Sequence, residues 1–296
     1  PAFYSRWFIN RLEEGYVLVR NPYNPKQITK YLLNENVVDC FIFCTKNPRN
    51  MLPYLAYLKP YKQLWFVTIT PYGKDIEPNI VDKRKVFQDF IYLSNTIGKS
   101  NLILRYDPIF INDTYTVDKH IHYFETMVKI LYAYTDVVVI SFVDLYKKVK
   151  RNFPELKEVS AQDKLRLVKA FVCIGKQYNL TIKTCGEGHD FDAYGVDSSG
   201  CMSKDVILNV LGPHYKLEKK SSIRPGVCDC FMGNDIGAYD SCMNLCRYCY
   251  ANTSKEKVMQ NYLNHDENSP LLIGHIEEGD VIHQYKQISY EEITLF

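Results

Sequence analysis

The chain has 296 residues, of which 46% are hydrophobic, so it can bury a core large enough for a barrel-sized domain with a small appendage. Lys and Arg number 36 against 34 Asp and Glu, and the net charge of +2 gives no support to a nucleic-acid partner. No apolar run reaches the roughly 18 residues that a membrane span needs. Ten cysteines without a visible leader are typical of a reducing cytoplasm and not of a disulfide scaffold.

Short apolar runs rich in β-branched and aromatic residues recur along the first two thirds of the chain. Continuous runs of this kind are typical of parallel strands that are covered on both faces. They predict strands at 16–19, 37–43, 64–69, 102–106, 137–142 and 180–183. Apolar residues at helical spacing predict helices between them, at 5–14, 86–97, 117–134 and 161–178.

This alternation of strand and helix predicts the α/β class, with parallel β/α units forming a TIM-like barrel that is either incomplete or permuted. A doubly wound open sheet is the alternative, although no Gly-x-Gly-x-x-Gly stretch or P-loop follows any strand. From about Val196 the alternation ends and turn residues crowd in. We therefore expect a barrel-like domain over 1–195 and a cysteine-rich iron–sulfur cap over 196–296, a loop-rich segment that its thiols would order.

Three thiols fall within eight residues of this cap, at the spacing Cys-x3-Cys-x2-Cys. Cys242, Cys246 and Cys249 can turn toward one metal or cluster, and three ligands leave one coordination position open for a small molecule. Structural zinc more often recruits two Cys-x2-Cys pairs, so the spacing favours a [4Fe–4S] cluster over zinc. Tyr248 and Tyr250 flank the last thiol and would shield the cofactor from water.

Four further thiols are candidates for a second, closed cluster or a structural zinc site. One follows the last predicted strand and two form a Cys-x-Cys pair; the four are Cys185, Cys201, Cys228 and Cys230. Cys40, Cys44 and Cys173 lie inside strand or helix patterns, where we expect burial in the core.

Polar residues follow the predicted strands, at the edge where loops build the active site of a β/α barrel. We expect them to orient a substrate or cofactor in one polar pocket: Lys46, Lys74, Arg105, Asp107, Asp144 and Glu187. Arg105 and Asp107 lie two apart on an extended chain and so share a face, as either a structural ion pair or a substrate clamp. The seven histidines show no zinc-hydrolase spacing.

Several stretches resemble the family known as domain of unknown function 1848 over nearly the whole chain. They include Thr45-Lys46-Asn47-Pro48, Arg105-Tyr106-Asp107-Pro108, Asp235-Ile236-Gly237-Ala238-Tyr239 before the three thiols, and the longer run 70–78. The resemblance implies a barrel and a cluster, because the family's C-terminal cysteines resemble the motif of radical S-adenosylmethionine proteins. A Ser-Arg-Arg-Thr-Asp-Ile stretch of that family, with its strand, has no counterpart before Pro1.

The function indicated by these patterns is that of a radical S-adenosylmethionine-like enzyme, with one or two [4Fe–4S] clusters and S-adenosylmethionine as cofactors. An unknown small molecule would be the substrate, and a ferredoxin or flavodoxin would be the electron donor. Two alternatives stay open. The thiols could staple a ligand- or partner-binding barrel through zinc or closed clusters, or the chain could be an electron-transfer or redox-sensing protein in which Cys230 completes the triplet's ligand set.

Overall fold

The computed structural model describes residues 1–217, 227–231 and 233–292. Its strands are β1 (Tyr16–Arg20), β2 (Gln27–Leu32), β3 (Cys40–Thr45), β4 (Lys62–Thr68), β5 (Leu102–Ile109), β6 (Val137–Phe142), β7 (Thr181–Thr184) and β8 (Val281–Gln284). Its α-helices are α1 (Ser5–Glu14), α2 (Lys83–Ile97), α3 (Val117–Leu131), α4 (Lys147–Asn152), α5 (Ala161–Gln177), α6 (Lys204–Leu211) and α7 (Lys255–Leu263). A 3₁₀ helix, η1 (Arg49–Leu58), joins β3 to β4.

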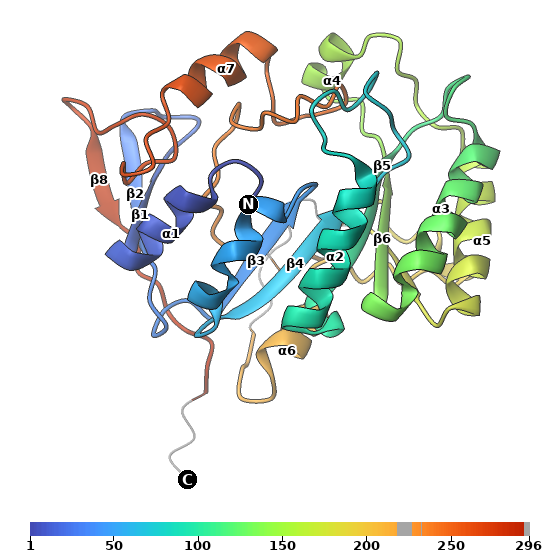
Figure 1. Ribbon diagram of the computed structural model, residues 1–296, viewed down its shortest axis with the longest axis horizontal. Coiled ribbons are helices and arrows are strands. Elements are labelled where there is room, and N and C mark those ends of the chain that lie inside the picture. Colours follow the sequence, from blue (N-terminus) through green and yellow to red (C-terminus); the bar gives the residue numbers. More distant parts are fainter. Residues whose placement is uncertain (218–226, 232, 293–296) are drawn as a thin grey trace.

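The larger sheet has five parallel strands in the order β3-β4-β5-β6-β7 (Figure 1). Its register places Cys44 beside Phe66, Thr68 beside Arg105, and Arg105 beside Val139, so these side chains share one face. The α/β class and the parallel units are therefore confirmed, and each of the six predicted strands overlaps an observed one.

The two faces of this sheet are covered differently. On one face, apolar side chains such as Trp65, Leu104 and Ile140 pack with residues of α2, α3 and α5. On the other, Leu64, Phe66, Ile103 and Val139 pack with α6 and with residues of the cysteine-rich segment. Within the described residues the sheet is open and does not close into a barrel, because the face that would line the barrel interior is filled by this segment.

The crossover helices begin where the sequence supplies a capping side chain. Asp82 accepts a hydrogen bond from the Arg84 amide at the start of α2, and Thr116 and Ser160 cap α3 and α5 in the same way. These caps satisfy amide groups that have no partner inside the helix. They fix where each helix leaves the loop after a strand, and so where the loops at the carboxyl edge of the sheet can lie.

The first predicted strand is not part of the parallel sheet. β1 pairs antiparallel with β2, which in turn pairs parallel with β8 in a separate three-stranded sheet. The apolar run at 16–19 gives no sign of this, because it resembles the other predicted strands and the adjacent partner strand β2 is not among the predicted ones. Figure 1 shows this sheet beside α1, with β8 close to the strands from the start of the chain.

The last hundred residues return to both sheets instead of forming loops alone. They contain α6, α7 and β8, which the loss of alternation did not predict. In the described residues, no helix is both long and apolar enough to cross a membrane.

Candidate functional site

The three spaced thiols, Cys242, Cys246 and Cys249, are called the triplet here, and they lie over the carboxyl edge of the larger sheet. The Arg247 amide donates to the carbonyl of Ile76 in the loop after β4, at 3.0 Å. From the loop after β6, the Asn152 side chain donates to the carbonyl of Asn252, at 3.3 Å. The loops that follow parallel strands therefore hold this segment in place. Figure 1 shows α4, from the same loop, on the side of the molecule where α7 lies.

A buried carboxylate, Glu77, lies directly beneath the triplet. Its side chain is 1% exposed, and it accepts hydrogen bonds from Thr70 at 2.7 Å, from Lys83 at 2.7 Å and from the Tyr248 hydroxyl. Burial acts to raise the pKa of Glu77, but the lysines Lys46 and Lys83 and these hydrogen bonds outweigh it and lower that pKa to about 2. The carboxylate is therefore ionised at neutral pH.

The positive charge of Lys46 is only partly neutralised by Glu77, which is shared with Lys83. Its Nζ lies 3.1 Å from Glu77 Oε1 and 5.6 Å from the centre of the Tyr248 ring. The Nζ atom is buried and makes no hydrogen bond of good geometry. Two lysines thus face one carboxylate, which leaves an excess of positive charge next to Cys246.

Burial favours the neutral thiol form of two triplet residues, Cys242 and Cys246. Burial raises the pKa of Cys246 to about 12, although Lys46 acts to lower it. Burial also raises the pKa of Cys242. Thiols of this kind ionise when a metal binds them, because the metal charge replaces the lost solvation.

A second polar region lies on the face of the sheet opposite α2, α3 and α5. Arg105 Nε donates to both carboxylate oxygens of Asp107, at 3.1 and 3.0 Å, and Ser141 donates to Asp107 at 3.3 Å. Arg105 and Asp107 therefore form an ion pair with each other. Beside them Cys44 is exposed and not buried in the core as expected, yet desolvation by neighbouring protein raises its pKa.

Cys173 is also exposed, on α5, whereas core burial was expected there as well. Cys40 is half-buried. Burial was expected for the two exposed thiols because cysteine is small and apolar, but that character alone does not place a residue on the core-facing side of its element.

The four thiols that were candidates for a second metal site are called the quartet and lie on the sheet face that carries Arg105: Cys185, Cys201, Cys228 and Cys230. Cys201 Sγ lies 3.3 Å from Cys185 Sγ and 3.5 Å from Cys230 Sγ, and Arg105 Nη1 is 3.5 Å from Cys201 Sγ. The Cys230 amide donates to Cys228 Sγ at 3.4 Å. The fold thus brings the sulfurs of Cys185, Cys201 and Cys230 into contact and places Cys228 Sγ beside the Cys230 amide.

In the part of the chain that the structure describes, no group of three or more His, Cys, Asp or Glu side chains is arranged so that it could hold a metal ion as it stands. Both thiol groups consist of cysteines, whose thiolates are the ligand type that iron–sulfur clusters and zinc favour. The buried, unbonded Lys46 Nζ beside the triplet adds a charge that suits a negatively charged cluster.

The other predicted site residues are spread over the carboxyl edge and do not all converge. Lys74 is exposed and donates to the Ile80 carbonyl in its own loop. Asp144 is exposed and accepts from Tyr146 at 3.1 Å, whereas Glu187 accepts from the Phe142 amide at 2.8 Å and lies 3.5 Å from Lys164. Burial raises the pKa of Glu187.

The two tyrosines beside the last thiol differ sharply in exposure. The Tyr248 ring is 6% exposed and belongs to the apolar cluster that contains Cys246. Tyr250 is 61% exposed and packs against Tyr146, with 5.7 Å between ring centres. Tyr248 is thus placed to exclude water from the triplet, and Tyr250 lies at its rim.

The sequence did not single out Glu77 or Lys83. Both lie in or next to the loop after β4, where a carboxylate and a lysine are ordinarily solvated. One signal was present: apolar Ile76 and Ile80 flank Glu77, and both are buried. An acidic residue between buried positions of a loop is a candidate for a buried ion pair.

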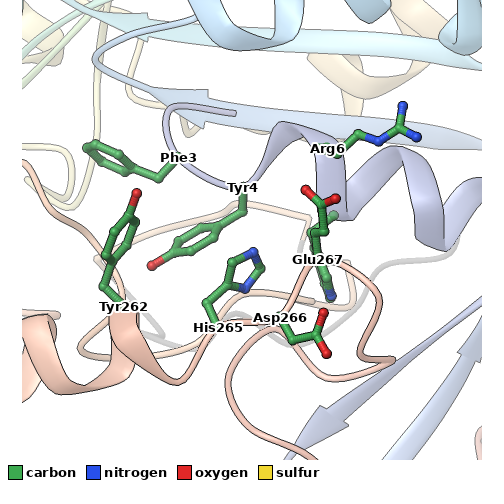
Figure 2. A pocket seen from close by; sticks show the side chains of 8 residues that line it. Phe3, Tyr4, Arg6, Tyr262, His265, Asp266 and Glu267 are labelled. Carbon is green, nitrogen blue, oxygen red and sulfur yellow. The ribbon is translucent and has the colours of Figure 1, made fainter.

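A pocket on the outer side of the triplet segment lies between the start of the chain and the residues after α7. Figure 2 shows the Tyr4, Tyr262 and His265 rings grouped there, with Asp266 and Glu267 beside them. Tyr4 and His265 ring centres are 4.6 Å apart, and the Tyr4 hydroxyl donates to the Ser241 carbonyl at 2.6 Å. This hydrogen bond joins the pocket wall to the residue before Cys242.

Comparison with curated proteins finds no match to this sequence. A family model described as domain of unknown function (DUF1848) matches residues 1–251, which include β1 to β7 and both thiol groups. The chain therefore belongs to the DUF1848 family.

Proposed function

We propose that this protein is an iron–sulfur enzyme of the radical S-adenosylmethionine-like kind, with a [4Fe–4S] cluster on Cys242, Cys246 and Cys249. The observation that carries the proposal is the excess positive charge beneath the triplet. An oxidised cubane held by three thiolates has a net charge of about −1. Lys46, buried and without a hydrogen bond, is placed to balance that charge.

The residues around the triplet have separate tasks in this proposal. Glu77 holds Lys46 and Lys83 in place, and Tyr248 ties the triplet segment to Glu77 while covering Cys246. A three-thiolate cluster supplies an open iron, where the amino and carboxylate groups of S-adenosylmethionine can bind and from which the cofactor can receive one electron. These residues would keep water away from that position.

The substrate would lie on the sheet face next to Cys44 and the Arg105–Asp107 pair. There, accessible Cys44 and the charged side chains offer polar contacts to a small molecule. A ferredoxin or flavodoxin would supply the electron in a reducing cytoplasm.

The electron-transfer alternative requires a fourth thiolate at the triplet, and Cys230 was its candidate. Cys230 Sγ instead lies 3.5 Å from Cys201 Sγ, in the apolar cluster on the sheet face, whereas Cys246 belongs to a different cluster. This placement favours an open position at the triplet.

The test is electron paramagnetic resonance of the anaerobically reconstituted and reduced protein, with and without S-adenosylmethionine. We expect a cubane signal that changes when S-adenosylmethionine is added and that is lost in Cys246→Ser. Cys173→Ser, on an exposed helix position, should leave the signal unchanged. Iron-free protein with zinc at the triplet, or a cubane signal indifferent to S-adenosylmethionine, would refute the proposal.

A further inference from the structure

We propose that the quartet binds one zinc ion in tetrahedral geometry and so fastens the cysteine-rich segment to the larger sheet. The ligands would be Cys185 at the end of β7, Cys201 before α6, and the pair Cys228 and Cys230. This site is separate from the triplet and does not depend on the chemistry proposed there.

The spacing of the sulfurs distinguishes a single ion from a second cubane. Zn–S bonds of about 2.3 Å in a tetrahedron place the sulfurs about 3.8 Å apart. The sulfur of Cys201 lies 3.3 Å from that of Cys185 and 3.5 Å from that of Cys230, close to this value. Thiolates on a cubane bind different irons and are separated by the iron–sulfur core, so their sulfurs do not touch.

The backbone that carries the ligands is already assembled. The Phe231 amide donates to the Met202 carbonyl at 2.7 Å, so the segments around Cys201 and Cys230 run side by side. Gly200 has φ +97°, and a Cβ at this position would lie 3.2 Å from the amide nitrogen of Cys230. Close approach of the two segments therefore requires glycine at this position.

Hydrogen bonds to sulfur complete the surroundings that a thiolate needs. The Met202 amide donates to Cys230 Sγ and the Cys230 amide to Cys228 Sγ, both at 3.4 Å. Arg105 Nη1 lies 3.5 Å from Cys201 Sγ. Donors of this kind orient metal-bound thiolates and offset their negative charge.

Closing the site around an ion requires the side chains to turn, because as they stand no three described His, Cys, Asp or Glu side chains could hold one. The Cys201 and Cys230 segments need no rearrangement for this, since they are already hydrogen-bonded to each other. Rotation about χ1 between staggered positions is sufficient to redirect a cysteine sulfur.

The experiment is metal analysis of the full chain after anaerobic purification from medium that contains both zinc and iron. We expect about one zinc per chain, and a fall of at least about tenfold in zinc retained against a chelator for Cys201→Ser. X-ray absorption at the zinc edge should show sulfur neighbours at about 2.3 Å. Cys173→Ser is the matched control and should keep its zinc.

Cys230→His is a second variant that keeps a zinc ligand at its position. It tests the proposal even where Cys201→Ser fails to fold. We expect this variant to retain zinc with a mixed nitrogen and sulfur spectrum. A disulfide between Cys185 and Cys201, iron at the quartet, or zinc that survives Cys201→Ser would overturn the proposal. Cys246→Ser separates the two proposals, because it should remove the cubane signal and leave the zinc in place.

Discussion

The triplet and the quartet place thiols in opposite kinds of environment. The triplet comes from one short segment and lies over a buried ion-pair network in which Lys46 and Lys83 face Glu77. The quartet is assembled from segments far apart in sequence, and the sulfurs of Cys185 and Cys230 both contact that of Cys201 against an apolar sheet face. Charge therefore organises the triplet, whereas backbone packing organises the quartet. Each can therefore be disturbed separately.

Glu77→Gln should produce the largest effect and should act on the triplet alone. Removing the buried carboxylate leaves two partly buried lysines without their shared partner, which we expect to cost about 3–5 kcal/mol of unfolding free energy. Urea denaturation measures this cost. Glu125→Gln is the control, because its 2.7 Å pair with Lys129 is on the exposed surface of α3 and its loss should change stability little. A similar small loss for Glu77→Gln would mean that charge does not organise the triplet.

Acid should weaken the protein in two successive steps, of which only the second belongs to the triplet. Burial lowers the pKa of His120 from 6.5 to about 4, so its contribution is complete above pH 6.5 and is lost as the pH falls toward 4. The pKa of Glu77 is lowered from 4.5 to about 2, and its contribution of about 3 kcal/mol is lost between those values.

Thermal unfolding measured from pH 7 to pH 2 tests this order. Glu77→Gln should flatten the dependence below pH 4.5 and leave the step between pH 6.5 and 4 intact, because His120 bonds to Tyr106 and Phe110 instead of to the Glu77 network. If the unfolding temperature of Glu77→Gln fell below pH 4.5 as steeply as that of the unaltered protein, the assignment of this step to Glu77 would be contradicted.

Gly200→Ala should produce the smallest effect and should act on the quartet. The new Cβ would lie 3.2 Å from the backbone at Asp229 and Cys230, in addition to the strain of a positive φ. Gly212→Ala is a matched control, with φ +99° and open space around its Cβ. We expect Gly200→Ala to lose about 1–2 kcal/mol more than the control and to bind zinc less tightly, while iron content stays the same. Equal losses of unfolding free energy in the two variants would indicate that the segments around Cys201 and Cys230 do not need to approach so closely.

The regular part of the fold was readable from sequence because each element carries its own pattern. The run at 137–142 matches β6, and the 5–14 pattern matches α1. Sheet membership was not readable, since the apolar run of β1 is like those of the other predicted strands and its partner β2 carries no such run. α6 and α7 are short and lie among turn residues, so the loss of alternation concealed them.

The candidate site also has a part that could be found from the sequence and a part that could not. Spacing alone singled out Cys242, Cys246 and Cys249 because all three ligands lie in one segment. Glu77 was missed because its role depends on Lys46 and Tyr248, which reach it from the end of β3 and from the triplet segment. A buried charge network has no local signature when each member comes from a different loop.

The pairing of β8 with β2 has a mechanical consequence for the triplet. The segment that carries the three thiols lies between the larger sheet and β8, and β8 is hydrogen-bonded alongside a strand from the start of the chain. The segment is therefore anchored on both sides: by hydrogen bonds to the loops at the carboxyl edge and by the pairing of β8 with β2. We expect a variant that weakens the β2–β8 pairing to raise amide exchange at Ile282 and, through the chain that connects β8 to the triplet, at Cys249 as well.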